Sequence, residues 1–202
     1  MNKYIISLSI IIFAIISCNN NSSEAENENS GDLFSNRKIT FKKLELFEEG
    51  VTYTNSYSIT NIGVKFSPPI NSIKLSDEEK ENIISQTGYG KDLFYTDSIF
   101  IDEKVKITCL AAYMKKDETS LDNFINFVKS MKDGNNFTEE YYIINGKKNI
   151  QFKINMNNTT YIFFTIFESV NDNYFILNYT FPVSYLEDSM VRIANSLSSV
   201  KF

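Results

Sequence analysis

Few side chains in this sequence have the type and spacing that acid–base or nucleophilic chemistry needs. The 202 residues include no histidine, which excludes serine and cysteine triads that use an imidazole and the common histidine-containing zinc sites. Glu139 and Glu140 are adjacent carboxylates, but neighbouring side chains of a strand point to opposite faces, so the two cannot share a substrate. The acids at 77–79 follow Ser76 and match a capping box, so we interpret them as helix-capping residues. No catalytic residue is predicted.

Two short motifs resemble ligand-binding loops in composition only. Gly88-Tyr89-Gly90-Lys91 lacks the spacing of a phosphate-binding loop, and we expect its glycines to end a preceding helix. Asn171-Asp172-Asn173 is rich in oxygen atoms, but it lacks the glycine and the distal glutamate of an EF-hand calcium loop. We interpret the second motif as a hairpin turn, and we predict neither a cofactor nor a metal ion.

Cys109 is the cysteine that remains once Cys18 is assigned to an export signal, as argued below. It alternates with Val105, Ile107 and Ala111 on one face of a predicted strand. No cationic neighbour on that face would lower the pKa of the thiol, which a nucleophilic cysteine requires. Cys109 is therefore predicted to be a small buried hydrophobic side chain, with an intermolecular disulfide or a reactive thiol as the alternative.

The charge balance of the chain bears on its partners. Twenty Lys and Arg residues stand against 25 Asp and Glu residues, which gives a formal net charge of −5 and a pI near 4.9. A general nucleic-acid-binding protein needs a basic face, so nucleic acid is not an expected partner. Hydrophobic residues make up 43% of the chain, which is enough for the core of one domain.

Aromatic residues are the remaining chemical signal, with 12 tyrosines and 17 phenylalanines. Tyr53, Tyr57, Tyr141 and Tyr142 stand among polar residues, whereas the segment 163–167 carries apolar residues on both strand faces. An exposed tyrosine patch would suit the recognition of a protein or a glycan, so these four tyrosines are the candidate binding residues. Core packing or an ordinary amphipathic edge is the alternative explanation for them.

The first 18 residues, MNKYIISLSIIIFAIISC, have the pattern of an export signal. Lys3 provides a positive start, and the apolar run 5–16 would span roughly 18 Å as a helix, well short of a hydrocarbon core of about 30 Å. Ile15-Ile16-Ser17-Cys18 resembles the lipobox of bacterial lipoproteins, with Ile15 where the strictest form has Leu. The resemblance implies that residues 1–17 are a signal peptide and that Cys18 becomes the diacylated first residue. An ordinary signal peptide with an incidental Cys18 is the alternative.

An acidic, polar spacer follows this leader. Residues 19–36 are dominated by Asn, Ser and Glu, and they cannot bury enough apolar surface to offset the loss of backbone entropy. We therefore predict that residues 18–36 form the lipidated end and a disordered tether, and that residues 37–202 form one domain. This organisation predicts a location in the cell envelope, anchored by lipid to a bacterial membrane, either inner or outer.

Alternating patterns between turn residues predict the elements of the domain. The expected strands are 52–60, 63–67, 93–101, 105–114, 137–144, 149–156, 159–170 and 174–181. The expected helices are 76–86, 120–132 and a last helix that opens with a second capping box at Ser184. Asn145-Gly146 is the strongest hairpin signal, because both residues tolerate positive φ. The order predicts an α+β fold, a single antiparallel β-sheet of about six to eight strands packed with about three α-helices.

Three short segments of the sequence resemble PsbP-like and Mog-like domains. They are the opening segment 63–69 (GVKFSPP), the turn Ile144-Asn145-Gly146-Lys147, and the ending segment 193–197 (IANSL). The chain departs from many members of this family in lacking a tryptophan after the prolines. The resemblance implies an antiparallel sheet with helices on both sides and an accessory or binding role, and it carries over no functional residue.

The expected function is therefore that of a membrane-anchored bacterial lipoprotein with a non-catalytic binding or accessory domain. Its partners would be a membrane, reached through the lipid anchor, and a protein or another component of the envelope. One alternative is a lipoprotein that binds a small ligand, which would need a cavity of about 300 Å³ or more. The other is an envelope enzyme that uses carboxylates alone, with two acids roughly 5 to 10 Å apart in one cleft.

Overall fold

The computed structural model describes residues 33–35, 38–44, 55–87, 92–132 and 134–202. Its strands are β1 (Lys42–Lys43), β2 (Tyr57–Ile59), β3 (Val64–Phe66), β4 (Ile73–Lys74), β5 (Tyr95–Asp102), β6 (Ile107–Lys115), β7 (Asn136–Ile144), β8 (Lys147–Met156), β9 (Thr160–Val170) and β10 (Asn173–Pro182). Its helices are α2 (Asp77–Thr87), α3 (Ser120–Ser130) and α4 (Leu186–Ser198), with 3₁₀ turns at Leu33–Ser35 (η1) and Val183–Tyr185 (η2). The expected leader, Cys18, Tyr53 and the two glycines expected to end α2 lie outside the described residues.

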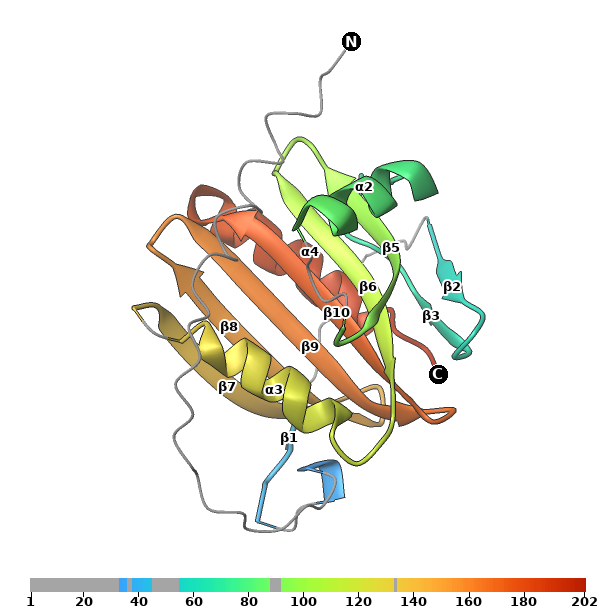
Figure 1. Cartoon of the computed structure of the whole chain (residues 1–202). Helices are drawn as coiled ribbons and strands as arrows, with labels where there is room; N and C mark the ends of the chain where they lie inside the picture. Colours follow the sequence, from blue (N-terminus) through green and yellow to red (C-terminus); the bar gives the residue numbers. More distant parts are fainter. Residues whose placement is uncertain (1–32, 36–37, 45–54, 88–91, 133) are drawn as a thin grey trace.

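Eight strands form one sheet in the order β1-β7-β8-β9-β10-β6-β5-β4 (Figure 1). The strands β7 to β10 form the expected antiparallel meander, and β10 continues the sheet by pairing with β6, which forms the expected hairpin with β5. The predicted α+β class is confirmed. Two details differ from the prediction, because β2 and β3 form a separate two-stranded sheet and β1 joins β7 in parallel.

Asparagine-rich turns join the strands of the meander. Positive φ at both central residues characterises the type I′ turn, whose twist matches that of the flanking antiparallel strands. The residues of positive φ at these three turns are Asn145, Gly146, Asn157, Asn158, Asn171 and Asp172. The Asn145-Gly146 hairpin is thereby confirmed, and Asn171-Asp172-Asn173 is the hairpin turn that its composition predicted.

One face of the large sheet packs against α3, and α2 lies on the same side (Figure 1). The apolar stripe of α3 is buried there, and the ring of Phe124 makes edge contacts with the rings of Phe94 and Phe164 at centroid distances of 5.6 and 5.7 Å. Ile83 of α2 joins the same cluster. The predicted helix 120–132 is thus confirmed in both its position and its buried face.

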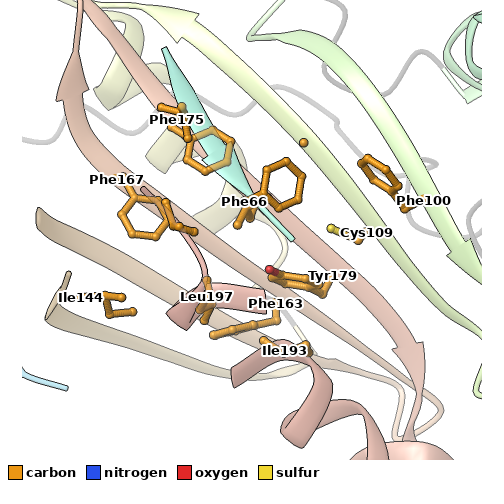
Figure 2. Close-up of a cluster of buried hydrophobic side chains, with 14 of the residues drawn as sticks. Phe66, Phe100, Cys109, Ile144, Phe163, Phe167, Phe175, Tyr179, Ile193 and Leu197 are labelled. Carbon is orange, nitrogen blue, oxygen red and sulfur yellow. The ribbon is translucent and has the colours of Figure 1, made fainter. Parts of the chain in front are cut away.

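The opposite face of the sheet packs against α4 and the β2–β3 hairpin. Figure 2 shows Ile193 and Leu197 of α4 directed toward aromatic side chains of the central strands. In that cluster the ring of Phe167 stacks on the ring of Phe175 at a centroid distance of 5.6 Å. Because β9 and β10 bury apolar side chains on both faces, the sheet is the middle layer between helices, as the family resemblance implied.

The domain begins before residue 37, the boundary that the sequence predicted. Phe34 is 3% exposed, its ring stacks on those of Phe41 and Tyr174, and its carbonyl oxygen accepts a hydrogen bond from Lys148 Nζ. The three residues of η1 therefore belong to the folded domain rather than to the expected tether. Leu33 packs against the same cluster, so two apolar residues after a polar segment join it to the domain.

The first two α-helices begin at the expected polar residues, whereas the third does not. Ser76 and Glu79 form a reciprocal capping box, in which Ser76 N donates to Glu79 Oε2 and Glu79 N donates to Ser76 Oγ. The box predicted at Ser184 is wrong, because α4 begins only at Leu186 and receives no side-chain cap. The chain leaving β10 is held instead by Val183 N, which donates to Thr159 O. Within the described ranges, no helix has the length and apolar character to cross a membrane.

Candidate functional site

The three segments of the family resemblance meet at the C-terminal end of α4. The amide of Asn145, in the Asn-Gly turn, donates to the carbonyl oxygens of Ser198 and Val200 at 2.8 Å each. Lys65, in the opening segment, exchanges two backbone hydrogen bonds with Lys201. These contacts satisfy carbonyls that the end of a helix leaves without partners, so the role of the turn here is structural.

A chain of buried hydroxyl groups completes this junction. Tyr179 OH donates to Ser196 Oγ at 2.9 Å, and Ser196 Oγ donates to Ser67 O at 2.7 Å. Ser67 N in turn donates to Ser199 Oγ at 2.7 Å. The backbone of Ser67 in the opening segment is thus bound by the side chains of Ser196, in α4, and of Ser199, which follows the helix. We therefore assign Ser67 and Ser196 to the fold rather than to a binding site.

The most buried carboxylate also holds the fold together. Asp102, at the end of β5, forms a salt bridge with Arg192 of α4 at 2.7 Å, and the Asp102 side chain is only 2% exposed. The same guanidinium donates to Ile70 O, and the other Asp102 oxygen accepts a hydrogen bond from Lys104 N. This salt bridge fixes α4 to the β5–β6 turn, which makes Asp102 a poor candidate for acid–base chemistry.

The adjacent carboxylates of β7 lie on opposite faces, as predicted. Glu139 forms a salt bridge at 2.9 Å with Lys129 of α3, on the α3 side of the sheet. Glu140 forms one at 2.7 Å with Lys153, whose ammonium lies over the ring of Phe163 on the α4 side. The Lys153 hydrogen bond lowers the pKa of Glu140, so this carboxylate is held in its ionised form. The two acids therefore do not form a catalytic pair.

Tyr141 and Tyr142, two of the candidate binding residues, are half-buried and also lie on opposite faces. Tyr141 OH donates to Glu139, and its ring packs edge-on against Phe41 at 5.7 Å. Tyr142 OH donates to Glu140 at 2.9 Å. Both hydroxyls thus orient the carboxylates beside them, and the two rings do not form one surface.

Tyr57 lies at the other end of the sheet, beside β4 and β5. Its hydroxyl donates to Asp97 Oδ2 at 2.8 Å and accepts a hydrogen bond from Lys74 Nζ at 3.2 Å. Its ring packs edge-on against Phe66 and Phe100. The structure therefore does not bring Tyr57 together with the tyrosines of β7, because four strands lie between β7 and β5 in the sheet order.

Two tyrosines that the sequence did not single out form an exposed aromatic pair on β5 and β6. Tyr95 of β5 is 55% exposed, and its ring packs on that of Tyr113 of β6 at a centroid distance of 5.1 Å. Tyr113 OH accepts a hydrogen bond from the amide of Asn61, in the β2–β3 turn. The sequence places each tyrosine near the outer end of a strand in the predicted hairpin. It does not give the cross-strand register that pairs the two residues.

A cleft of about 360 Å³ is lined by residues at the ends of the same two strands. It lies between the beginning of β5, the end of β6 and the N-terminal end of α3. Besides the two tyrosines, its lining includes Asp92, Lys115, Asp117, Thr119, Asn123 and Asn173. It therefore combines aromatic carbon with side-chain amides, a hydroxyl and charged groups of both signs, and we take it as the candidate binding site.

Asp117 fixes the wall of this cleft that α3 provides. Its Oδ1 atom accepts hydrogen bonds from the backbone amides of Thr119 and Ser120 at 2.9 and 2.7 Å. These backbone hydrogen bonds lower the pKa of the Asp117 carboxyl, so it is ionised and engaged at neutral pH. The carboxylate thus occupies the positive end of the helix dipole.

Cys109 is fully buried between Phe100 and Tyr179, as Figure 2 shows. Burial raises the pKa of its thiol, because a thiolate would lose its solvation in the core. The prediction of a buried, small hydrophobic side chain is confirmed.

We expect the Cys109 thiol to react with a disulfide reagent only when the domain opens. In the folded chain, labelling should be at least about a thousandfold slower than in guanidinium chloride, since reaction requires exposure of the core. Thiol labelling followed by intact-mass analysis measures both rates. Rapid labelling of the folded chain would contradict the core assignment of Cys109.

The comparisons with known proteins agree with this architecture. No protein-family model matches the chain, and no curated protein sequence matches it either. Among solved structures, the fold is similar to that of cyanobacterial PsbP (CyanoP) from Synechocystis sp. PCC 6803, determined in solution. The match has a TM-score of 0.50 and 13% sequence identity, and it covers 73% of this chain and 91% of that one. It confirms a PsbP-like fold and, at this identity, the fold alone.

Proposed function

We propose that this chain is a membrane-anchored bacterial lipoprotein whose α+β domain is a non-catalytic binding or accessory module for a protein or another component of the cell envelope. The observation that carries the proposal is structural. Asp102, Glu139 and Glu140 form salt bridges and Asp117 caps a helix, while a cleft at the start of α3 stays open. A domain arranged in this way is suited to recognition.

The anchor is supported by the leader sequence. The apolar run 5–16 has the length of an export signal and is too short to span a membrane stably. It is followed by Ser17, a small residue, and then by Cys18. Each buried CH₂ of an acyl chain contributes about 0.8 kcal/mol of membrane binding, so a diacylated Cys18 would hold the chain on a bilayer. The polar tether behind it would let the domain stand clear of the lipid headgroups.

The alternative of a carboxylate enzyme is less well supported. Asp92 and Asp117 both line the cleft, but Asp117 is ionised and accepts two backbone hydrogen bonds. A glycosidase-type mechanism needs one carboxyl with a raised pKa to serve as a general acid. The pKa of Asp117 is shifted in the opposite direction.

The anchor is tested with the full chain expressed in a bacterial host supplied with radioactive palmitate. We expect label on the wild-type chain and on the Cys109→Ser control, recovery of both in the membrane fraction, and complete loss of label from the Cys18→Ser variant. The reason is that the thiol of Cys18 would be the acylated group, whereas Cys109 is buried in the folded domain. Undiminished labelling of Cys18→Ser would place the acyl group elsewhere in the chain, and an unlabelled wild-type chain would leave an ordinary signal peptide as the explanation.

A further inference from the structure

Asn145, in the β7–β8 turn, is the one asparagine of the sequence that is followed by a glycine. In such a pair the backbone nitrogen of the glycine can attack the side-chain amide carbon of the asparagine, because glycine has no Cβ to hinder the approach. The new C–N bond closes a five-membered succinimide ring, and the side-chain nitrogen takes the proton of the attacking N–H group and leaves as ammonia. Water then opens the ring at either carbonyl and leaves aspartate or isoaspartate. The turn thus carries a modification chemistry whose only co-reactant is water.

The fold holds the Asn145 amide away from this reaction. Its Nδ2 atom donates to the carbonyl oxygens of Ser198 and Val200 at 2.8 Å each. Asn145 and Gly146 have φ values of 50° and 79°, which belong to the tight turn that pairs β7 with β8. Ring closure must bring the side-chain amide carbon onto Gly146 N, so the side chain has to leave both carbonyl oxygens first. The reaction therefore requires that the C-terminal end of α4 separates from the turn.

The product of the reaction cannot restore this contact. An ionised aspartate side chain has no N–H group, so the carbonyl oxygens of Ser198 and Val200 would face a carboxylate instead of a donor. Isoaspartate also adds a methylene group to the main chain of a two-residue turn. Carbonyl groups that lose their donor and lie beside a negative charge are costly, so the end of α4 is then held less tightly.

The turn holds more in place than the end of α4. Val200 is fully buried, and Lys201 exchanges two backbone hydrogen bonds with Lys65 of β3, at 2.8 and 2.9 Å. A cleft of about 490 Å³ lies at this junction, and Asn145 and Lys201 are among its lining residues. Water that opens the succinimide ring therefore has access to the turn, and loss of the amide at Asn145 is transmitted to β3.

We infer that Asn145 is a deamidation site gated by the C-terminal end of α4. Its amide reacts while the hydrogen bonds to Ser198 and Val200 are open, and the carboxylate that forms keeps the junction between α4 and β3 loosened. The modification acts as a one-way chemical switch within the folded domain. It does not depend on the lipid anchor, so the palmitate experiment and the two experiments below can fail separately.

The gate is tested by the rate at which Asn145 deamidates in the full chain, followed by peptide mass mapping. We expect slow reaction in the folded chain, fast reaction in guanidinium chloride, and suppression of the fast reaction by Gly146→Ala. Ser196→Ala should speed the reaction of the folded chain by at least about tenfold, because it breaks hydrogen bonds at the end of α4. The matched control is Phe124→Leu, which weakens the core on the opposite face of the sheet.

Urea unfolding measures the global stability of both variants. An acceleration by Phe124→Leu as large as its loss of global stability predicts, with no larger acceleration by Ser196→Ala, would assign the gate to global unfolding and overturn the inference. Equal rates in the folded chain and in guanidinium chloride would overturn it as well, since the fold would then provide no gate.

The consequence of the modification is tested with Asn145→Asp, which has the side chain of one product. We expect the backbone amides of Lys65 and Lys201 to exchange hydrogen at least about tenfold faster in this variant, because the junction that they form opens more often. Asn157→Asp is the matched control, since Asn157 has the same φ of 50° in the turn at the other end of β8. Unchanged exchange in Asn145→Asp, or an equal change in Asn157→Asp, would overturn the inference that this amide controls the junction.

Discussion

Replacing Arg192 with methionine is expected to lower the free energy of unfolding by about 3–5 kcal/mol, because it leaves the Asp102 carboxylate buried without its cation. Methionine keeps much of the length and the apolar packing of the arginine stem, so the loss reflects charge more than volume. Arg192 also donates to Ile70 O, and that carbonyl would lose its partner too. In a chain of this size the melting temperature should fall by on the order of 10 °C.

Urea unfolding of the single and double variants separates the cause of this loss. Adding Asp102→Asn to Arg192→Met should recover a large part of the stability, since a neutral amide can be buried more cheaply and its oxygen can still accept the bond from Lys104 N. If Arg192→Met were as stable as wild type, or if the second change deepened the loss, the buried charge would not be the reason.

This salt bridge could not have been predicted from the sequence. Asp102 and Arg192 are 90 positions apart, and Asp102-Glu103-Lys104 has the composition of an ordinary hairpin loop. The two residues meet because α4 packs on one face of the sheet, where Arg192 reaches the end of β5. Pairings of this kind are decided by topology, which local patterns of charge do not specify.

The local features of the fold were the predictable ones. Asn145-Gly146 and the Ser76–Glu79 box each act within a few residues, through positive φ and through reciprocal capping bonds. The box at Ser184 failed for the opposite reason. There the backbone of Val183 is fixed by Thr159 across the sheet, and this tertiary hydrogen bond replaces the local cap.

The candidate site was predicted only in part. Tyr57 was selected because its neighbours in sequence are polar, and its hydroxyl binds Asp97 of β5, the strand that also carries Tyr95. Tyr95 and Tyr113 were not selected, and the contact between their rings exists only in the register of β5 against β6. Sequence context thus shows whether a tyrosine has polar neighbours along the chain, whereas a binding surface depends on neighbours across the strands.

The family resemblance also gains a physical meaning. Segments 63–69, 144–147 and 193–197 are far apart in the chain, yet their hydrogen bonds converge on the end of α4. A motif that satisfies buried backbone groups is constrained by the fold, whatever the domain binds. It follows that similarity in these segments is evidence for architecture rather than for a shared ligand.

The hydroxyl network at this junction leads to the second large effect. Ser196→Ala is expected to destabilise the domain by about 2–4 kcal/mol, because it removes partners from two buried groups, the hydroxyl of Tyr179 and the carbonyl of Ser67. Ser189→Ala is the matched control on the same helix. Its hydroxyl is also buried, but it has no hydrogen-bond partner in the part of the chain that the structure describes, so its removal should be neutral or stabilising.

A double-mutant cycle tests whether the loss of stability in Ser196→Ala comes from the broken hydrogen bonds or from the small volume that the missing oxygen leaves empty. Tyr179→Phe removes the hydroxyl that Ser196→Ala would leave without this partner, so the double variant should be less destabilised than the sum of the two single variants. Urea unfolding of the wild type, the two single variants and the double variant gives the four free energies of the cycle. Strict additivity, or an equal loss in Ser189→Ala, would mean that the packing of α4 dominates. A positive coupling would mean that the hydroxyl chain from β10 through α4 to the opening segment holds the C-terminal end of α4 in place.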